Sequence, residues 1–414
     1  MAAREALLDR FIRYAKIDTQ SSDSSTTCPS TEKQKDLLRV LVDDLKEAGL
    51  EDAAMDEWGY VMATLPSNLP RLKVPTVGLI AHVDTYFGVT GTNVQPQVHR
   101  NYDGQDIALP GDPSIVIRVA DEQELASCKG LTIITTDGTT LLGADDKAGV
   151  AVILEALWQW RDDPSRAHGP IRIGFTPDEE VGRGTEHFDV QRFGSDYAYT
   201  IDGSGLGSLE AETFCADTAF VTVTGADVHP GYAKNKMVNA VRVLSAFLMA
   251  LPQHRTPETT EGREGFLHPM AMSGNPSEAK AQLIVRDFAE EGLYALEAIL
   301  TDTAAFMKRR YPGSKVGVEI KQAYRNMRYQ LDAHPHVVAY ADEAIRRAGL
   351  TPQRLPVRGG TDGSRLSFMG LPTPNLFNGS MNFHGKKEWV PLEWMEKSVE
   401  TVLNLMAIWT EHAS

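Results

Sequence analysis

Cysteine is scarce in this chain, and so are long apolar runs. Only three of the 414 residues are cysteines, Cys28, Cys128 and Cys215, and they form no CxxC pair. Their spacing excludes a disulfide framework and a thiolate zinc site, so we expect a reducing, cytoplasmic location. No apolar run reaches the roughly 18 residues of a membrane span. The first twenty residues mix acids and bases in an amphipathic pattern and lack the apolar core of a signal peptide.

Basic residues are also outnumbered. The chain has 41 Lys and Arg against 56 Asp and Glu, which gives a formal net charge of −15. That balance argues against electrostatic binding of nucleic acid. A length of 414 residues exceeds what one hydrophobic core usually organises, so two domains are expected.

Strands and helices alternate along much of the chain. The segments 74–81, 171–175 and 197–201 are short apolar runs typical of buried strands, and 148–160 is a helix pattern that is apolar nearly all round. Amphipathic helices are also expected over the first fifteen residues and over about 32–48. This alternation predicts an α/β sandwich.

A different pattern occupies the middle of the chain. From residue 212 the order is strand, helix, strand, helix, strand, which suits a small self-contained α+β layer. After about residue 322 the earlier alternation resumes. We therefore predict a domain at 212–322 inserted into a larger one formed by 1–211 and 323–414.

Acids and histidines follow the predicted strands. They are His82 and Asp84, Asp178 to Glu180, Asp202, and His384, and Asp145 and Asp146 begin a helix nearby. Taken singly, each has an ordinary explanation as a helix cap, a local hydrogen bond or a solvated turn. Ligands bind at the carboxyl ends of strands in open α/β sheets, so their joint position favours one shared site.

The types of side chain narrow the ion that such a site would hold. Two imidazoles with several carboxylates and no thiolate suit zinc, cobalt or manganese, whereas calcium and magnesium prefer oxygen ligands alone. The candidates are too many for one tetrahedral catalytic ion. Two ions that share one carboxylate would use them all.

Nine ordered sequence blocks make the chain recognisable. They read AHVDT, LLGADDKAG, TPDEEVGRG, TIDG, VHPGYAKNKMVNA, TTEGREGF, IVRDF, RGGTDGSRLSFMGLPTPNLFNG and NFHGKKEWV. In this order and spacing they resemble the peptidase T family of two-zinc metallopeptidases, which are tripeptide aminopeptidases. The resemblance implies a mixed-sheet catalytic domain with an inserted lid or dimerisation-type domain, and small peptides as substrates.

The resemblance also assigns roles to residues. It implies two zinc ions per chain, with cobalt or manganese as substitutes. The implied ligands are His82 and Asp202 for one ion, Glu180 and His384 for the other, and Asp145 as the bridge. Glu179 matches the general base, and the bond between Asp145 and Asp146 is expected to be cis. Asp84, two residues from His82, can accept the other imidazole N–H and so fix the ligand's tautomer.

Three further residues are expected to bind substrate from the inserted domain. The resemblance implies that His229 stabilises the oxyanion, and that Asn239 and Arg286 hold the peptide backbone or carboxylate. His229 would reach the metals only if the domain closes over the substrate, or if a second subunit of a homodimer presents it.

The chain departs from the family pattern at two places. Tyr86-Phe87-Gly88 stands where Ser-Pro-Asp is common, and Tyr232 where a threonine is usual, which leaves the peptide preference open. The alternatives are a related two-zinc dipeptidase, carboxypeptidase or N-acyl amino acid deacylase, or a module that binds metal or peptide without catalysis. A nucleotide-binding protein is disfavoured, because GxGxxG and Walker motifs are missing.

Overall fold

The computed structural model describes residues 2–413 and divides into two compact units. The first comprises Met1–Ala211, Gln330–Leu355 and Thr361–Ser414, and the second comprises Glu212–Tyr329 and Pro356–Gly360. The five-residue piece is anchored within the second unit by Arg358. Its guanidinium donates to the carbonyl oxygens of Gly262 and Glu264 at 2.8 and 3.1 Å.

The first unit is built on an eight-stranded mixed sheet. The strand order is β1-β2-β8-β3-β9-β16-β10-β15, and the central strands β8 (Ile171–Thr176), β3 (Val77–His82), β9 (Tyr197–Gly203) and β16 (Asn375–Phe377) run parallel. Every residue of β3 is buried, as expected of a parallel strand covered on both faces. The three predicted strands and the α/β class are thereby confirmed.

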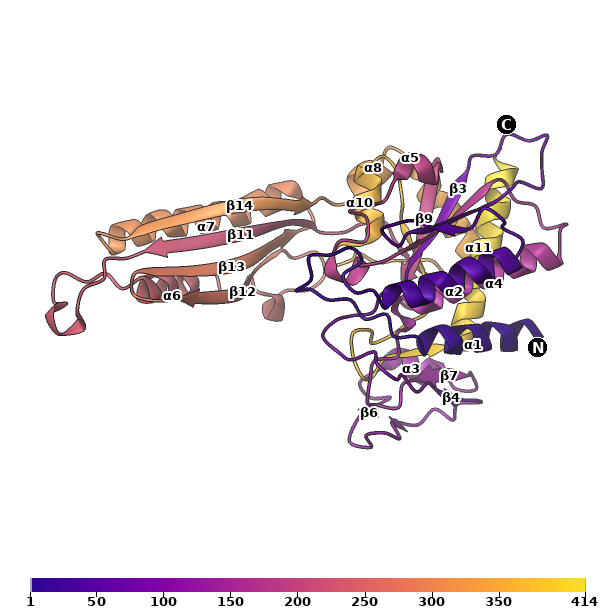
Figure 1. Cartoon of the computed structure of the whole chain (residues 1–414), viewed down its shortest axis with the longest axis horizontal. Helices are drawn as coiled ribbons and strands as arrows, with labels where there is room; N and C mark the ends of the chain where they lie inside the picture. The colour runs from indigo at the N-terminus through magenta and orange to yellow at the C-terminus, as the bar shows by residue number, and fades with distance from the viewer. Residues whose placement is uncertain (1, 414) are drawn as a thin grey trace. The chain divides into compact units, whose positions relative to one another are not determined.

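Helices cover this sheet. Helix α4 (Ala144–Asp162) packs on β3 and β9, and α1 (Ala2–Ala15) and α11 (Leu392–Glu411) pack on α4 (Figure 1). The helix predicted over 148–160 is thus a buried one, which explains why it is apolar nearly all round. Other helices of the unit are α2 (Gln34–Glu47), α3 (Gln123–Ser127), α5 (Val190–Phe193), α9 (Pro335–Arg347) and α10 (Asp362–Phe368).

Several short strands were not expected from the sequence. The outermost strands of the large sheet, two on each side, are β1 (Ala54–Met55), β2 (Val61–Leu65), β10 (Ser208–Glu210) and β15 (Gln353–Arg354). A three-stranded sheet joins β17 (Trp389–Pro391), β7 (Ile133–Thr135) and β4 (Gln97–His99), and β5 (Ile107–Ala108) pairs with β6 (Val116–Ile117).

The second unit is a four-stranded antiparallel sheet with two helices. Its order is β12-β13-β11-β14, with β11 (Cys215–Thr224), β12 (Phe266–Gly274), β13 (Glu278–Asp287) and β14 (Lys315–Tyr324). Helices α6 (Ala240–Ala250) and α7 (Glu290–Arg310) lie on one face (Figure 1), and α8 (Arg328–Leu331) follows β14. The alternating burial of β13 shows that the other face is open to solvent.

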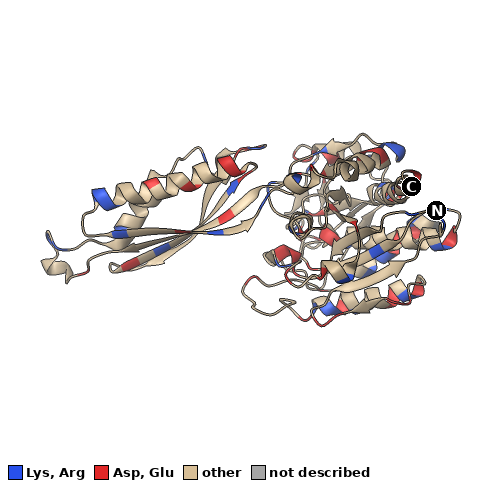
Figure 2. Ribbon diagram, turned by 90° about the horizontal axis from the view of Figure 1, so that it is seen from above, with Lys and Arg blue, Asp and Glu red and all other residues tan. Residues whose placement is uncertain are grey.

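Charged residues are distributed over both units. Figure 2 shows Lys and Arg interspersed with Asp and Glu along the helices of each unit. Within residues 2–413, each helix is too short or too polar to cross a bilayer.

Candidate metal centre

Four neighbouring strands bring the predicted site residues to one edge of the large sheet. Strand β3 ends at His82, β8 leads into the 3₁₀ turn Glu179–Val181, β9 carries Asp202 near its end, and the chain after β16 leads to His384. Because these strands are parallel and adjacent, their carboxyl ends meet. The start of α4 adds Asp145.

Asp145 lies between two sets of donor atoms. Its Oδ1 is 3.0 Å from Nε2 of His82, and its Oδ2 is 3.2 Å from Nε2 of His384. Nε2 of His82 is also 3.4 Å from Oδ1 of Asp202, and Nε2 of His384 is 2.8 Å from Oε2 of Glu180. The result is two groups of three ligand-type residues, each within 4.8 Å, that have Asp145 in common.

The donor set fits divalent cations. Burial raises the pKa of Glu180 to about 8 and that of Asp202 to about 7, because removal from water disfavours the ionised carboxylates, and a bound cation would offset that cost. In addition, Oε1 of Glu180 is buried without a hydrogen-bond partner among the described residues. Mixed imidazole and carboxylate donors of this kind suit zinc, cobalt or manganese.

Asp84 organises the turn that carries the acidic pair. Its two carboxylate oxygens accept hydrogen bonds from the backbone N–H groups of Glu179 at 3.0 Å and Glu180 at 3.1 Å. Nδ1 of His82 lies 3.0 Å from the Asp84 carbonyl oxygen and 3.3 Å from its carboxylate. The main chain of Asp84 therefore holds this ring at least as closely as the carboxylate that the sequence singles out.

Asp146 and Lys147 explain how charges fit into an apolar segment. The carboxylate of Asp146 accepts from the backbone N–H of His82 at 3.2 Å and from Nδ2 of Asn378 at 2.8 Å. Lys147 donates to the carbonyl oxygen of Ile17 at 2.7 Å, and burial lowers its pKa to about 8. The peptide bond between Asp145 and Asp146 is cis, as the resemblance implies.

Glu388 is a residue of the site that the sequence analysis missed. Its carboxylate is 1% exposed and accepts three backbone N–H groups, from Leu142 at 2.7 Å, Gly143 at 2.8 Å and Asp145 at 3.0 Å. These bonds hold the loop that presents Asp145. The only available signal in the sequence was an acid four residues after His384 and directly before an apolar run.

An aromatic ring covers one of the histidines. Tyr86 stacks on His384, with ring centroids 4.3 Å apart and planes within 7°. The sequence identified residues 86–88 as a departure from the family pattern, but it gave no partner for Tyr86.

The three expected substrate-binding residues lie in the second unit. His229 precedes the 3₁₀ turn Pro230–Tyr232, and its Nδ1 accepts from the N–H of Gly231 at 3.1 Å. Asn239 caps α6 through a bond from the N–H of Arg242. Arg286 on β13 donates to the carbonyl oxygens of Asp217 and Val285 at 3.1 and 3.0 Å.

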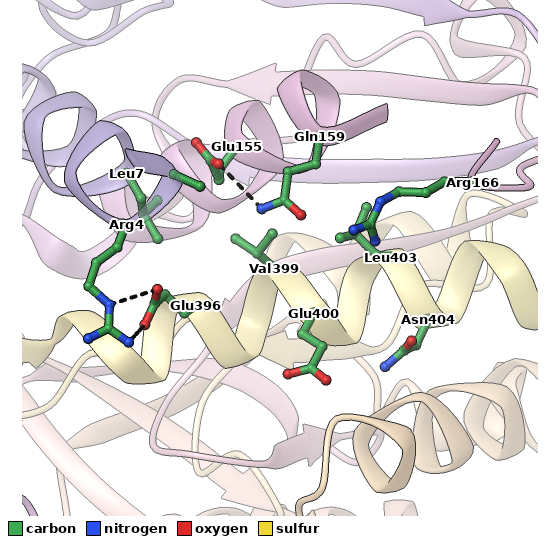
Figure 3. Close-up of a pocket in the computed structure, with 11 residues that line it drawn as sticks. Arg4, Leu7, Glu155, Gln159, Arg166, Glu396, Val399, Glu400, Leu403 and Asn404 are labelled. Atoms are coloured by element: carbon green, nitrogen blue, oxygen red, sulfur yellow. Dashed lines mark hydrogen bonds and ion pairs between the residues drawn. The ribbon is translucent and has the colours of Figure 1, made fainter. Parts of the chain in front are cut away.

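A cavity of about 390 Å³ lies between α1, α4 and α11 (Figure 3). Several of its charged groups are already paired. Arg4 forms an ion pair with Glu396 at 2.6 Å, and Glu155 is bound by Arg10 at 2.5 Å and by Gln159 at 3.3 Å. None of the predicted metal ligands lines this cavity.

Known proteins share both the sequence and the fold. Residues 136–407 match the model described as Peptidase family M20/M25/M40. The chain is 47% identical over 411 residues to Peptidase T of Geobacillus thermodenitrificans, which covers 99% of this chain and 100% of that protein.

Two solved structures have a similar fold. A tripeptidase from Staphylococcus aureus has a TM-score of 0.77 at 23% identity, and a dinuclear metal binding peptidase of the M20 family from Bacillus subtilis has a TM-score of 0.66 at 13% identity. Each comparison covers 99% of both chains. Together with the match at 47% identity, these findings confirm the predicted resemblance: the chain belongs to peptidase family M20/M25/M40 and, within it, groups with the peptidase T proteins.

Proposed function

We propose that the protein is a two-metal aminopeptidase that releases the N-terminal residue from tripeptides. The observation that carries this proposal is the position of Asp145, whose two oxygens face two separate sets of donors. The names of the relatives, Peptidase T and a tripeptidase, support the substrate class.

In this proposal each ion has two ligands of its own. His82 and Asp202 would hold one ion, Glu180 and His384 would hold the other, and Asp145 would serve both. Zinc is the expected ion, with cobalt or manganese as substitutes. When bound, the ions supply Lewis-acid chemistry that polarises the scissile carbonyl and lowers the pKa of a water.

The chain's own residues then position groups and move the proton. Glu179 takes a proton from the attacking water and returns it to the leaving amine. Its position is fixed by Asp84, which accepts the backbone N–H of Glu179 at 3.0 Å. Glu388 keeps the Asp145 loop in place through three backbone hydrogen bonds.

The second unit is proposed to act on the substrate. His229 stabilises the oxyanion, and Asn239 and Arg286 bind the peptide backbone or carboxylate. A guanidinium suits a carboxylate because its fork makes two parallel hydrogen bonds. We also propose a cytoplasmic location, which the three free thiols support. A homodimer formed through this unit stays a prediction.

Metal content and substrate choice test the proposal together. The purified protein should contain about two zinc ions and hydrolyse Ala-Ala-Ala, but neither Ala-Ala nor N-acetyl-Ala-Ala-Ala at a comparable rate. A chelator should stop hydrolysis, and added zinc should restore it. Equal hydrolysis of the N-acetylated peptide would contradict the need for a free amine and would favour a related deacylase or carboxypeptidase.

A further inference from the structure

A second cavity of the first unit is lined by chain segments that adjoin two predicted metal ligands. Its volume is about 720 Å³, and two of its walls are the loop 204–206, which follows Asp202, and the segment 381–383, which precedes His384. These two walls lie close together: a Cβ atom added at Gly205 would be only 3.3 Å from Sδ of Met381. Two predicted metal ligands are therefore continuous in the chain with the walls of one cavity.

The cavity offers apolar surface to solvent. Its apolar lining residues are Leu206, Leu355, Met381, Phe383 and Trp394. Of these, Leu355 is 48% exposed and Phe383 is 44% exposed. Large apolar side chains that gather at an open cavity mark a binding site more often than a random surface does.

The polar side chains that line the cavity are suited to bind a cation. Ser208 is 1% exposed, and its Oγ has no hydrogen-bond partner among the described residues. Glu124 is the one charged side chain among the described residues that line the cavity. Since no lysine or arginine is found in that lining, the cavity suits the amine end of a peptide and not its carboxylate end.

We propose that this cavity binds the N-terminal residue of the substrate, with a large apolar side chain such as that of Leu or Met against Leu355 and Phe383. The free ammonium lies toward Glu124 and the Ser208 hydroxyl. This inference rests on the proposed aminopeptidase function, and it names the preferred peptides. The cavity in Figure 3 carries no such inference, because several of its charged groups are paired with one another.

Tripeptide kinetics test the position of the side chain. The wild-type protein should have a higher kcat/KM for Leu-Gly-Gly than for Gly-Gly-Gly. Leu355→Ala and Phe383→Ala should each lower that preference roughly tenfold, the scale of a lost apolar contact in a specificity pocket, because Leu-Gly-Gly loses a contact that Gly-Gly-Gly never makes. Zinc content is measured for each variant, since the Phe383 ring also packs edge-on against His384 with centroids 5.3 Å apart. Phe368→Ala is the matched control, because Phe368 is an equally exposed phenylalanine of the same unit outside the cavity, at 44%.

The other outcomes overturn the inference. Equal losses for both peptides with zinc retained would mean that the cavity is not a side-chain subsite. A changed preference for Gly-Leu-Gly alone would assign it to the second residue of the peptide and contradict the N-terminal assignment.

A binding measurement separates this inference from the proposed function. Calorimetry with 3-methylbutylamine, the amine that corresponds to leucine without its carboxylate, requires no hydrolysis. Wild-type protein should bind this amine more tightly than 4-methylpentanoate, and Glu124→Gln should weaken amine binding several-fold. If no tripeptide is cleaved but the amine binds in this way, the aminopeptidase proposal fails and the cavity assignment stands. If tripeptides are cleaved and the amine does not bind, the cavity assignment fails alone.

Discussion

The sheets of the two units place polar side chains in different ways. Strand β3 of the first unit is buried at every position, whereas residues of β13 in the second unit alternate between buried and exposed. A strand covered on both faces can carry charged groups cheaply only where it ends, because an unpaired buried charge is costly. A strand with one face open to solvent can carry charged side chains along its length, as β13 carries Arg286.

This difference determines what each unit can do. The first unit concentrates carboxylates and imidazoles at one edge of its sheet, where a cation can neutralise them. The second unit has its own core, built from one face of the sheet with α6 and α7, and contains none of the predicted metal ligands. Substitutions in the first unit should therefore change metal content, and substitutions in the second should not.

Removal of Asp145 should have the largest effect. Asp145→Ala deletes the carboxylate that both donor groups share, so bound zinc should fall well below two per chain and activity should be lost. Elemental analysis of dialysed protein measures this. Asp162→Ala, at the opposite end of α4 with a 67% exposed side chain, should keep both ions. An Asp145→Ala protein with about two zincs would contradict the bridging role.

Loss of the general base comes next. Glu179→Gln retains the shape of the side chain but cannot accept a proton, so turnover should fall by roughly two to four orders of magnitude. Zinc content should stay at the wild-type level, which the same elemental analysis verifies. Near-normal turnover in zinc-loaded Glu179→Gln protein would place the base elsewhere.

A substitution in the second unit should change catalysis without changing the metal. His229→Ala should lower kcat more than it raises KM, by about two to three orders of magnitude if His229 stabilises the oxyanion. Steady-state kinetics separate the two constants, with zinc content as the control. A raised KM with kcat intact would make His229 a plain binding residue.

The core of the second unit offers a test of stability alone. Leu283 on β13 is fully buried, so Leu283→Ala should lower the free energy of unfolding of this unit by about 2–5 kcal/mol. The neighbouring Gln282 is exposed, and Gln282→Ala should change the free energy of unfolding by less than about 0.5 kcal/mol. Urea unfolding measures both. Loss of zinc from folded Leu283→Ala protein would show that the two units are not independent in this respect.

The smallest effect is expected at the stacked ring. Tyr86→Ser removes the face that covers His384 and should weaken zinc affinity roughly two- to tenfold, the scale of one aromatic pair. Tyr86→Phe keeps the ring and should restore wild-type affinity. Competition with a chromophoric chelator measures zinc affinity. Equal affinity in all three proteins would assign Tyr86 to substrate preference only.

The central strands could be predicted because their sequence pattern is strong. The buried strands β3, β8 and β9 appear as short apolar runs, and the acids and histidines that follow them mark the edge at which they meet. Strand β12 was missed, since it is an edge strand with Pro269 inside it and exposed side chains along most of its length. The strands of the three-stranded sheet, with three residues each, are too short to give a period.

Contacts between distant residues could not be predicted. The sequence places Asp145 and His384 at strand and helix ends, but it says nothing of the carboxylate of Glu388 under the Asp145 loop, 243 positions away. The stacking of Tyr86 on His384 likewise joins residues that are far apart in the sequence and could not be predicted. Such pairs depend on how the loops pack after the sheet has formed, and no local pattern encodes them.

The five residues Pro356–Gly360 set a condition for exchanging parts between relatives. They lie outside the continuous segment 212–329 but belong to the same compact unit, where Arg358 donates to the backbone of Gly262 and Glu264. A chimera that replaces only the continuous segment would leave Arg358 facing carbonyl groups from another protein. An exchange that transfers both segments keeps these bonds, so the transferable module of this chain is made of two pieces.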